Sequence, residues 1–67
     1  MNRQYVSSSR IRSVGWENGV LEIEFHDGAI YHYYDVSEYE YRNFISSSSL
    51  GSELSRLDKF KRYSPVR

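Results

Sequence analysis

The 67-residue sequence contains no cysteine, only one proline and no long apolar run. Without cysteine the chain can form neither a disulfide framework nor a thiolate zinc site. The N-terminus, Met1 to Tyr5, has no apolar stretch of signal-peptide length, and no run elsewhere approaches a membrane span. We therefore expect a protein that is neither secreted nor membrane-inserted, and the lack of cysteine fits the reducing cytoplasm.

Net charge is absent too, because nine basic and nine acidic residues cancel. The charges nevertheless fall in blocks: residues 1–16 carry only bases, residues 17–40 only acids, and residues 41–67 an excess of bases. A neutral chain has no overall attraction to nucleic acid. The blocks either neutralise one another across the fold or form a polarised binding surface, and the sequence leaves both open.

Aromatic residues are plentiful, at 16% of the chain, and seven of them are tyrosine. Disordered segments are poor in aromatic residues, so we expect a folded chain with tyrosine rings in its core. A chain of this length has room for a single domain, which buries roughly 60% of the surface that the unfolded chain exposes.

Two turn signals, Asn18-Gly19 and Asp27-Gly28, separate three segments in which apolar and polar residues alternate. This pattern predicts three antiparallel strands in a meander. The strands are expected at about residues 10–16, 20–26 and 29–35. Alternate residues of the middle strand should face the core, namely Leu21, Ile23 and Phe25.

The second hairpin can adopt either of two registers. A two-residue loop turns Ile30, His32 and Tyr34 to the core, whereas a three-residue loop at 26–28 turns Ala29, Tyr31 and Tyr33 there. We prefer the three-residue loop, with Gly28 in the left-handed conformation. That register buries two tyrosines and leaves His32 outside, opposite Glu22.

Two helices are predicted after the sheet, at about residues 38–46 and 50–58. Ser37 and Glu40 have the spacing of a capping box at the start of the first helix, and Tyr41, Phe44 and Ile45 give it one apolar stripe. The second helix has its apolar face at Leu50, Leu54 and Leu57, and Phe60 could extend it. The predicted fold is α+β: a three-stranded antiparallel β-meander followed by two short C-terminal helices packed on one face, with a basic tail at 59–67.

The sequence offers little for catalysis or for a metal ion. The only imidazoles are His26 and His32, and His32 with Glu22 falls short of the three or four ligands that zinc needs. Glu22 and Glu24 share one exposed strand face and lack the contrasting environments of a general acid and base. The glycines are scattered, which excludes a glycine-rich phosphate loop. We expect a non-catalytic binding domain with no metal and no cofactor.

Two segments could bind an anion or a nucleic acid. The serines at 46–49 precede a helix, where free N–H groups and hydroxyls can hold a phosphate, although helix capping explains them equally well. In the segment 59–63, basic residues alternate with Phe60 and Tyr63, whose rings could stack on unpaired bases. The alternative is that both rings lie in the core and the charges are solvated.

An ordered set of residues resembles the KTSC domain family. The set comprises Ser8-Ser9, Ile11, Val14-Gly15-Trp16, Leu21, Phe25, Gly28, Tyr31-His32-Tyr33, Val36, Ser49-Leu50-Gly51 and Tyr63. The chain departs from the family pattern at Ser37, where a proline is expected, and at Leu54 and Ser55, where an aromatic residue and an asparagine are expected. The family is named after the C-terminal segment of some lysyl-tRNA synthetases and also occurs as short stand-alone bacterial and phage-type proteins. The resemblance implies a small domain with RNA as a candidate ligand, and a mainly structural role for the motif residues Gly28, Tyr31, Tyr33, Ser49 and Gly51.

Two functions follow as expectations. The first is an RNA-binding accessory domain for a tRNA-like ligand, with candidate residues Arg10, Arg12, Arg56, Lys59, Lys61, Arg62 and Tyr63. It requires a basic face formed by the two ends of the chain. The second is a protein-interaction module in which exposed Tyr34 and Val20 and an edge strand near Ile11 meet a partner. It requires Ile11 and Tyr34 to be exposed.

Overall fold

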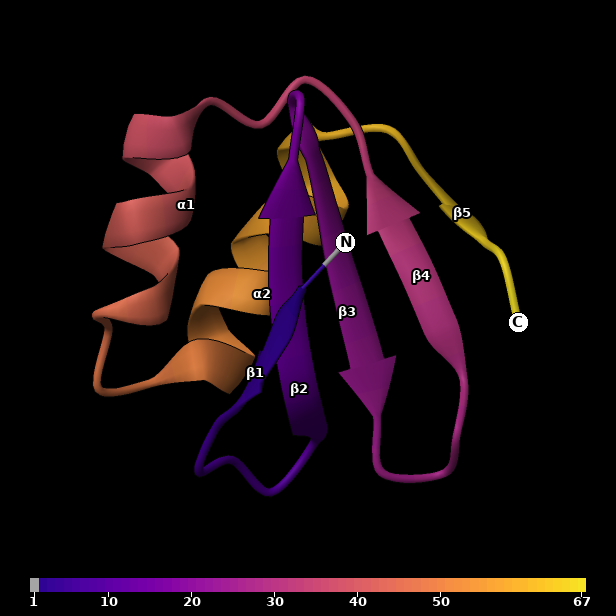
Figure 1. Ribbon diagram of the computed structural model, residues 1–67. Helices are drawn as coiled ribbons and strands as arrows, with labels where there is room; N and C mark the ends of the chain where they lie inside the picture. The colour runs from indigo at the N-terminus through magenta and orange to yellow at the C-terminus, as the bar shows by residue number, and fades with distance from the viewer. Residues whose placement is uncertain (1) are drawn as a thin grey trace.

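The computed structural model describes residues 2–67, which form one antiparallel sheet and two helices (Figure 1). The strands are β1 (Arg3–Tyr5), β2 (Ile11–Glu17), β3 (Val20–Phe25), β4 (Ile30–Tyr33) and β5 (Tyr63–Pro65). The helices α1 (Glu38–Ile45) and α2 (Leu50–Phe60) lie between β4 and β5 in the chain. The order across the sheet is β1-β2-β3-β4-β5. The α+β class and the antiparallel sheet are confirmed, but the sheet has five strands where three were predicted.

The strands missing from the prediction, β1 and β5, are the two outer ones and have three residues each. Both lie mostly exposed, so neither shows the alternation of apolar and polar residues that marks a half-buried strand. Pro65 has no N–H to donate and is tolerated because β5 is an edge strand. The predicted basic tail at 59–67 is therefore wrong, since Lys59 and Phe60 belong to α2 and Tyr63–Pro65 form β5.

The second hairpin has the three-residue loop. The N–H of Phe25 donates to the carbonyl of Ala29 at 2.8 Å, and Gly28 has a positive φ of 94°. The register pairs Ile23 with Tyr31 and Leu21 with Tyr33. The preferred register is confirmed, and both tyrosines point to the side of the sheet that the helices cover.

β4 ends at Tyr33, before the predicted end at residue 35, because Asp35 has a left-handed φ of 59° that does not continue a strand. Val36 follows as a buried residue, and its carbonyl accepts a hydrogen bond from Trp16 Nε1–H at 2.7 Å. This bond fixes the connection between the sheet and α1.

The capping box at the start of α1 is confirmed. Ser37 Oγ accepts from the N–H of Glu40 at 3.1 Å, and Glu40 Oε1 accepts from the N–H of Ser37 at 3.0 Å. Phe44 is buried, and the ring of Tyr41 stacks on Trp16 with centroids 6.0 Å apart. Local capping and one apolar stripe thus set the position of α1 beside β2.

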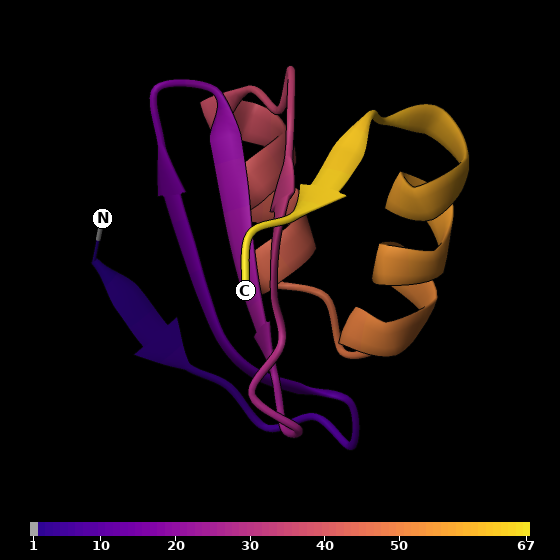
Figure 2. The same cartoon turned by 90° about the vertical axis from the view of Figure 1, so that its right-hand side faces the viewer.

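The second helix, α2, begins after Ser49 and lies on the same side of the sheet as α1 (Figure 2). Leu50 and Leu54 are buried, and burial of a leucine side chain contributes about 1.5–3 kcal/mol. The helix continues to Phe60, whose side chain is 76% exposed, so the expectation that it extends the apolar face is wrong. Each helical residue turns by about 100°, which carries Phe60 roughly 80° away from Leu50 around the axis.

The hydrophobic core fills the space between the sheet and both helices. Its buried members are Ile11, Val14, Leu21, Ile23, Tyr33, Val36, Phe44, Leu50 and Leu54. Of the helices formed by residues 2–67, neither has the length and apolar character needed to cross a bilayer.

Candidate functional site

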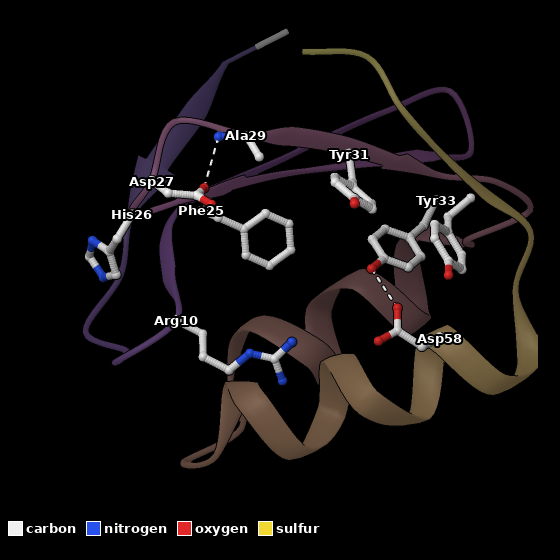
Figure 3. A pocket seen from close by; sticks show the side chains of 9 residues that line it. Arg10, Phe25, His26, Asp27, Ala29, Tyr31, Tyr33 and Asp58 are labelled. Carbon is white, nitrogen blue, oxygen red and sulfur yellow. Dashed lines mark hydrogen bonds between the residues drawn. The ribbon is translucent and has the colours of Figure 1, made fainter.

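A cavity of about 460 Å³ lies between the β3–β4 hairpin and α2, and we call it the tyrosine pocket. Its lining residues are Arg10, Phe25, His26, Asp27, Ala29, Tyr31, Tyr33, Asp58 and Tyr63. Figure 3 shows the rings of Phe25 and Tyr31 on the sheet side, with Arg10 and Asp58 on the side of α2. The pocket therefore places aromatic surface opposite charged groups.

The aromatic wall is a row of rings, each in contact with the next. Tyr31 meets Phe25 edge to face at 5.4 Å and stacks on Tyr63 at 5.7 Å, measured between ring centroids. Tyr63 also stacks on Tyr33 at 5.2 Å. Tyr63 comes from β5, so the C-terminal strand completes a wall whose other rings come from the hairpin. A wall of this kind suits a flat ligand ring, which can stack on it or meet it edge-on.

Tyr33 lies at the buried end of the pocket. Its side chain is 1% exposed, and its hydroxyl donates to Asp58 Oδ1 at 2.6 Å. Burial, together with this hydrogen bond, raises the pKa of Tyr33 far above its ordinary value of 10.0. At neutral pH the hydroxyl is therefore a fixed donor that ties β4 to α2.

The backbone of Arg10 is held in place by its neighbours. Ser8 Oγ accepts from the N–H of Arg10 at 3.2 Å and from that of Ile11 at 3.3 Å, and His26 Nε2–H donates to the Ser8 carbonyl at 2.8 Å. The side chain packs beside Gly51, where an added Cβ would lie 3.8 Å from Arg10 Cδ. Within residues 2–67 the Arg10 guanidinium makes no hydrogen bond or ion pair, so it can bind an anionic ligand.

Two of the family motif residues, which were expected to be mainly structural, line this pocket, and the other three lie elsewhere. Tyr31 and Tyr33 line it, Gly28 belongs to the hairpin loop beside it, and Gly51 lies next to Arg10. Ser49 is the N-cap of α2. Ser49 and Gly51 line a separate hollow beside Arg10, so only the two tyrosines connect the motif with the tyrosine pocket.

Phe25 and Asp58 line the pocket but were not predicted as site residues. Phe25 shares the core face of the hairpin with Tyr31, and Asp58 follows the buried Leu54 by one helical turn. An acidic residue at that spacing lies on the same side of the helix as the leucine. This break in the apolar stripe was the available signal for Asp58.

Three of the predicted RNA-binding bases, Lys61, Arg62 and Arg56, lie beside acidic groups. Lys61 Nζ lies 3.0 Å from Glu40 Oε2 and donates to the Asp35 carbonyl at 2.7 Å. Arg62 lies 3.8 Å from Asp35 Oδ2, with its guanidinium 5.9 Å from the ring centroid of Tyr34.

The predicted bases do not form one face, because Arg12 lies on β2 whereas Arg56 and Lys59 lie on α2. Arg12 sits over the ring of Tyr5 at 6.0 Å, next to β1, at the opposite edge of the sheet from β5. Arg56 lies 3.5 Å from Glu53 on α2, and Lys59 is exposed on the same helix. Of the seven predicted residues, only Arg10 and Tyr63 meet in the tyrosine pocket.

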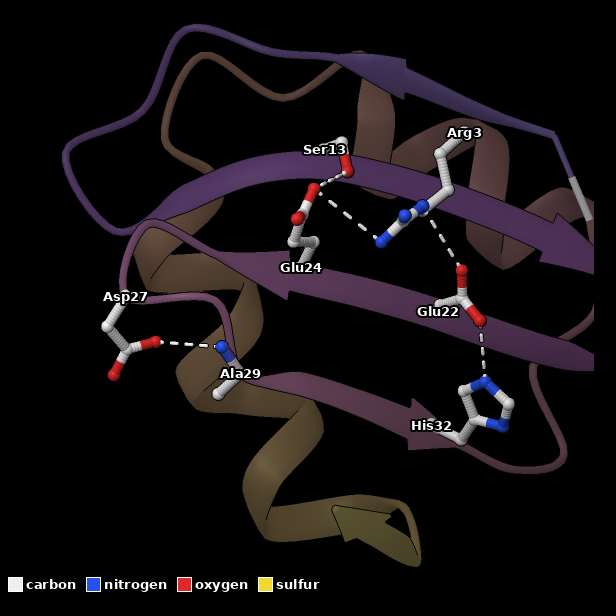
Figure 4. Close-up of polar contacts among 7 residues, drawn as sticks. All are labelled: Arg3, Ser13, Glu22, Glu24, Asp27, Ala29 and His32. Atoms are coloured by element: carbon white, nitrogen blue, oxygen red, sulfur yellow. Dashed lines mark hydrogen bonds and ion pairs between the residues drawn. The ribbon is translucent and has the colours of Figure 1, made fainter. Parts of the chain in front are cut away.

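The other face of the sheet carries a network of paired charges (Figure 4). Arg3 lies 3.2 Å from Glu22 and 3.6 Å from Glu24, and His32 Nε2–H donates to Glu22 Oε1 at 2.8 Å. The hydrogen bond that Glu24 accepts from Ser13 Oγ at 2.8 Å, with the charge of Arg3, holds the pKa of Glu24 below its usual range. The acidic and basic blocks thus neutralise one another here. In the part of the chain that the structure describes, no three metal-ligating side chains come together.

The serines near the start of α2 line a second hollow, of about 480 Å³, on the other side of Arg10. The N–H of Ser49 donates to Ser47 Oγ at 3.1 Å, and Ser49 Oγ donates to Ser52 Oγ at 3.0 Å. Ser46 Oγ donates to the carbonyl of Asn43 at 3.3 Å. Ser49 occupies the N-cap position of α2, but its side chain makes no capping hydrogen bond to the helix backbone.

The surface expected for a protein partner is largely covered. Ile11 is completely buried, and β1 pairs with β2 through Ser13, Val14 and Gly15. Tyr34 is half-buried, with its hydroxyl hydrogen-bonded to Ser64 Oγ at 2.6 Å. The edge strand required for strand addition near Ile11 is therefore missing.

Residues 7–60 match the family model of the KTSC domain. Over 65 residues the chain is 34% identical to an uncharacterised protein of Stutzerimonas stutzeri (strain A1501), an alignment that covers 94% of this chain and 92% of that protein. The family match contains every residue of the tyrosine pocket except Tyr63. This chain belongs to the KTSC domain family.

Proposed function

We propose that this domain binds single-stranded RNA without catalysing a reaction, and that the tyrosine pocket holds one unpaired nucleotide. The observation that carries the proposal is the position of Arg10, which has no charged partner within residues 2–67, opposite an aromatic wall that includes Phe25, Tyr31 and Tyr63. A nucleotide combines a flat base with an anionic phosphate, and the two sides of the pocket complement those two parts.

The two contacts have different physical origins. Stacking of a base on aromatic side chains contributes about 1–3 kcal/mol and works with every base, because each base has a π-face. The planar guanidinium of Arg10 matches phosphate oxygens with paired N–H donors. The cavity of about 460 Å³ also has the size of a typical small-ligand site.

Binding through this pocket should depend only weakly on salt. Lys61 is paired with Glu40, and Arg62 lies near Asp35, so these bases contribute less than the count of charges suggests. One phosphate contact at Arg10 gives a slope of about −0.7 in a plot of log K against log salt for single-stranded nucleic acid.

RNA is proposed over DNA because of the tRNA-charging enzymes from which the family takes its name, which is support by association. An RNA ligand would place the protein in the cytoplasm, and a chain without cysteine is compatible with that compartment.

The test is an NMR titration of isotope-labelled protein with a mixed pool of single-stranded RNA, at low and at high salt. We expect shifts at Arg10, Tyr31 and Tyr63 that shrink only slightly as salt rises, in keeping with a single phosphate contact. Arg10→Gln should weaken binding about tenfold, because it removes the phosphate contact. Arg42→Gln is the matched control: it removes the same charge from an exposed position on α1, and binding should stay near that of the wild type.

Two results would contradict the proposal. A spectrum unchanged by RNA at low salt would remove RNA as the ligand and make a protein partner the function to pursue. Shifts confined to the exposed residues of α2, with Arg10→Gln binding like the wild type, would move the RNA site out of the tyrosine pocket.

A further inference from the structure

We propose that the tyrosine pocket selects guanine, and that Asp58 is the residue that recognises it. This inference rests on the proposed function, and it adds the identity of the base. The aromatic rings of the pocket can stack on any base, so selection among bases must come from the polar side chains beside them.

Most polar side chains of the pocket are engaged elsewhere or do not discriminate. His26 Nε2–H donates to the Ser8 carbonyl, and Asp27 Oδ1 accepts from the N–H of Ala29 at 3.0 Å; both lie at the hairpin-loop end of the pocket, away from Tyr33 and Asp58 (Figure 3). The hydroxyls of Tyr31 and Tyr63 can donate or accept and therefore suit every base edge.

Asp58 differs from these groups because it lies on α2 and faces the aromatic wall across the cavity (Figure 3). Its Oδ1 accepts one hydrogen bond from Tyr33, which fixes the orientation of the carboxylate. An ionised carboxylate has about four acceptor positions, so a base stacked on the wall can still donate to both oxygens. An ionised carboxylate cannot donate in return.

Guanine is the base whose Watson–Crick edge fits such a group. Its N1–H and N2 amino group are adjacent donors, which can pair with the two oxygens of one carboxylate. Adenine and cytosine present one amino group next to a ring nitrogen acceptor, and uracil presents one N–H between two carbonyls. Each of these three turns a lone pair towards a carboxylate that can only accept, so it loses one of the two hydrogen bonds and meets electrostatic repulsion instead.

The test compares short single-stranded RNAs that differ only in the central base: UUGUU, UUAUU, UUCUU and UUUUU, each with a 5′ fluorophore. Binding is measured by fluorescence anisotropy. A matched two-point hydrogen bond discriminates between bases by about tenfold or more, so UUGUU should bind at least about tenfold more tightly than the others. Replacing the central guanine with inosine removes the N2 amino group and should give an intermediate affinity, whereas 7-deazaguanine keeps both donors and should bind like guanine.

Asp58→Asn should reduce the preference for guanine to about threefold or less, because an amide offers one acceptor and one donor. The variant should fold, since the side-chain carbonyl of asparagine can still accept from Tyr33, and urea unfolding checks this. Asp35→Asn is the matched control, because Asp35 is exposed outside the pocket and its left-handed conformation is one that asparagine adopts readily. It should keep the full preference.

The outcomes separate this inference from the proposed function. Equal binding of all four RNAs by the wild-type protein would overturn guanine selection and leave RNA binding intact. A guanine preference that survives in Asp58→Asn would remove Asp58 as the residue responsible. If none of the RNAs bound, the proposed function would fail and this inference with it.

Discussion

Tyr33→Phe should change the stability of the protein in opposite directions at neutral and at alkaline pH. At neutral pH the change removes the hydrogen bond from the buried hydroxyl to Asp58. A hydrogen bond to a charged acceptor contributes about 1.5–3 kcal/mol to stability. Because Asp58 is exposed and can bind water instead, we expect the free energy of unfolding to fall by about 1.5 kcal/mol.

At alkaline pH the comparison reverses because the pKa of Tyr33 is raised in the folded state. The unfolded chain releases this proton above its ordinary pKa of 10.0, while the folded chain keeps it. The contribution of Tyr33 to the free energy of unfolding is thus fully present below pH 10, and it falls by about 1.4 kcal/mol for each pH unit above that. The variant has no hydroxyl to ionise, so its stability should equal that of the wild type near about pH 11 and exceed it above that pH.

Urea unfolding followed by far-UV circular dichroism, from about pH 7 to about pH 12, measures both free energies. The other tyrosines ionise in both proteins and cancel in the comparison. Tyr39→Phe is the control, because Tyr39 is 75% exposed and its removal should leave the stability unchanged at every pH. A difference between wild type and Tyr33→Phe that is as large at about pH 11.5 as at neutral pH would refute the reasoning.

Two further changes test the α1 cap and the hairpin loop. Glu40→Gln should cost about 0.5–1 kcal/mol of stability at neutral pH, because it weakens the capping box and the ion pair with Lys61. The side chain of Glu40 is 42% exposed, so solvent screening keeps the contribution of the ion pair small. Hydrogen bonds from the Ser37 backbone and from Lys61 hold the pKa of Glu40 below its usual range, so urea titrations should show this deficit disappearing as the pH falls to about 3. Gly28→Ala should cost about 1–2 kcal/mol, because φ is 94° while no atom lies within 4 Å of an added Cβ, and Gly28→Asn should cost less. Equal thermal midpoints for wild type and Gly28→Ala would contradict the backbone origin of that cost.

The parts of the fold that depend on near neighbours in the chain could be predicted from the sequence. The alternation of Leu21 and Ile23 with glutamates identified β3, and the spacing of Ser37 and Glu40 identified the start of α1. Gly28 settled the hairpin loop through its freedom to adopt a positive φ. In each case the deciding interaction lies within a few residues, so the pattern of residue types contains it.

The tyrosine pocket could not be predicted in the same way because its parts meet only in the folded chain. Arg10, the hairpin tyrosines and Asp58 come from three separate regions of the sequence. The pairing of Lys61 with Glu40 also joins distant segments, and it removes a charge that the sequence alone presents as available. Composition counts charges, but only tertiary contacts decide which of them stay unpaired.

The short outer strands bear on how the protein behaves at high concentration. A molecule with no net charge has little electrostatic repulsion to keep copies apart. Long, flat edge strands would then let sheets of different copies join and grow into aggregates. Here each edge offers only three residues, and Pro65 cannot donate a hydrogen bond to an approaching strand. The longer and more apolar β2, β3 and β4 all lie between these edges, so the molecule is protected against sheet-to-sheet growth by its geometry where its charge gives no protection.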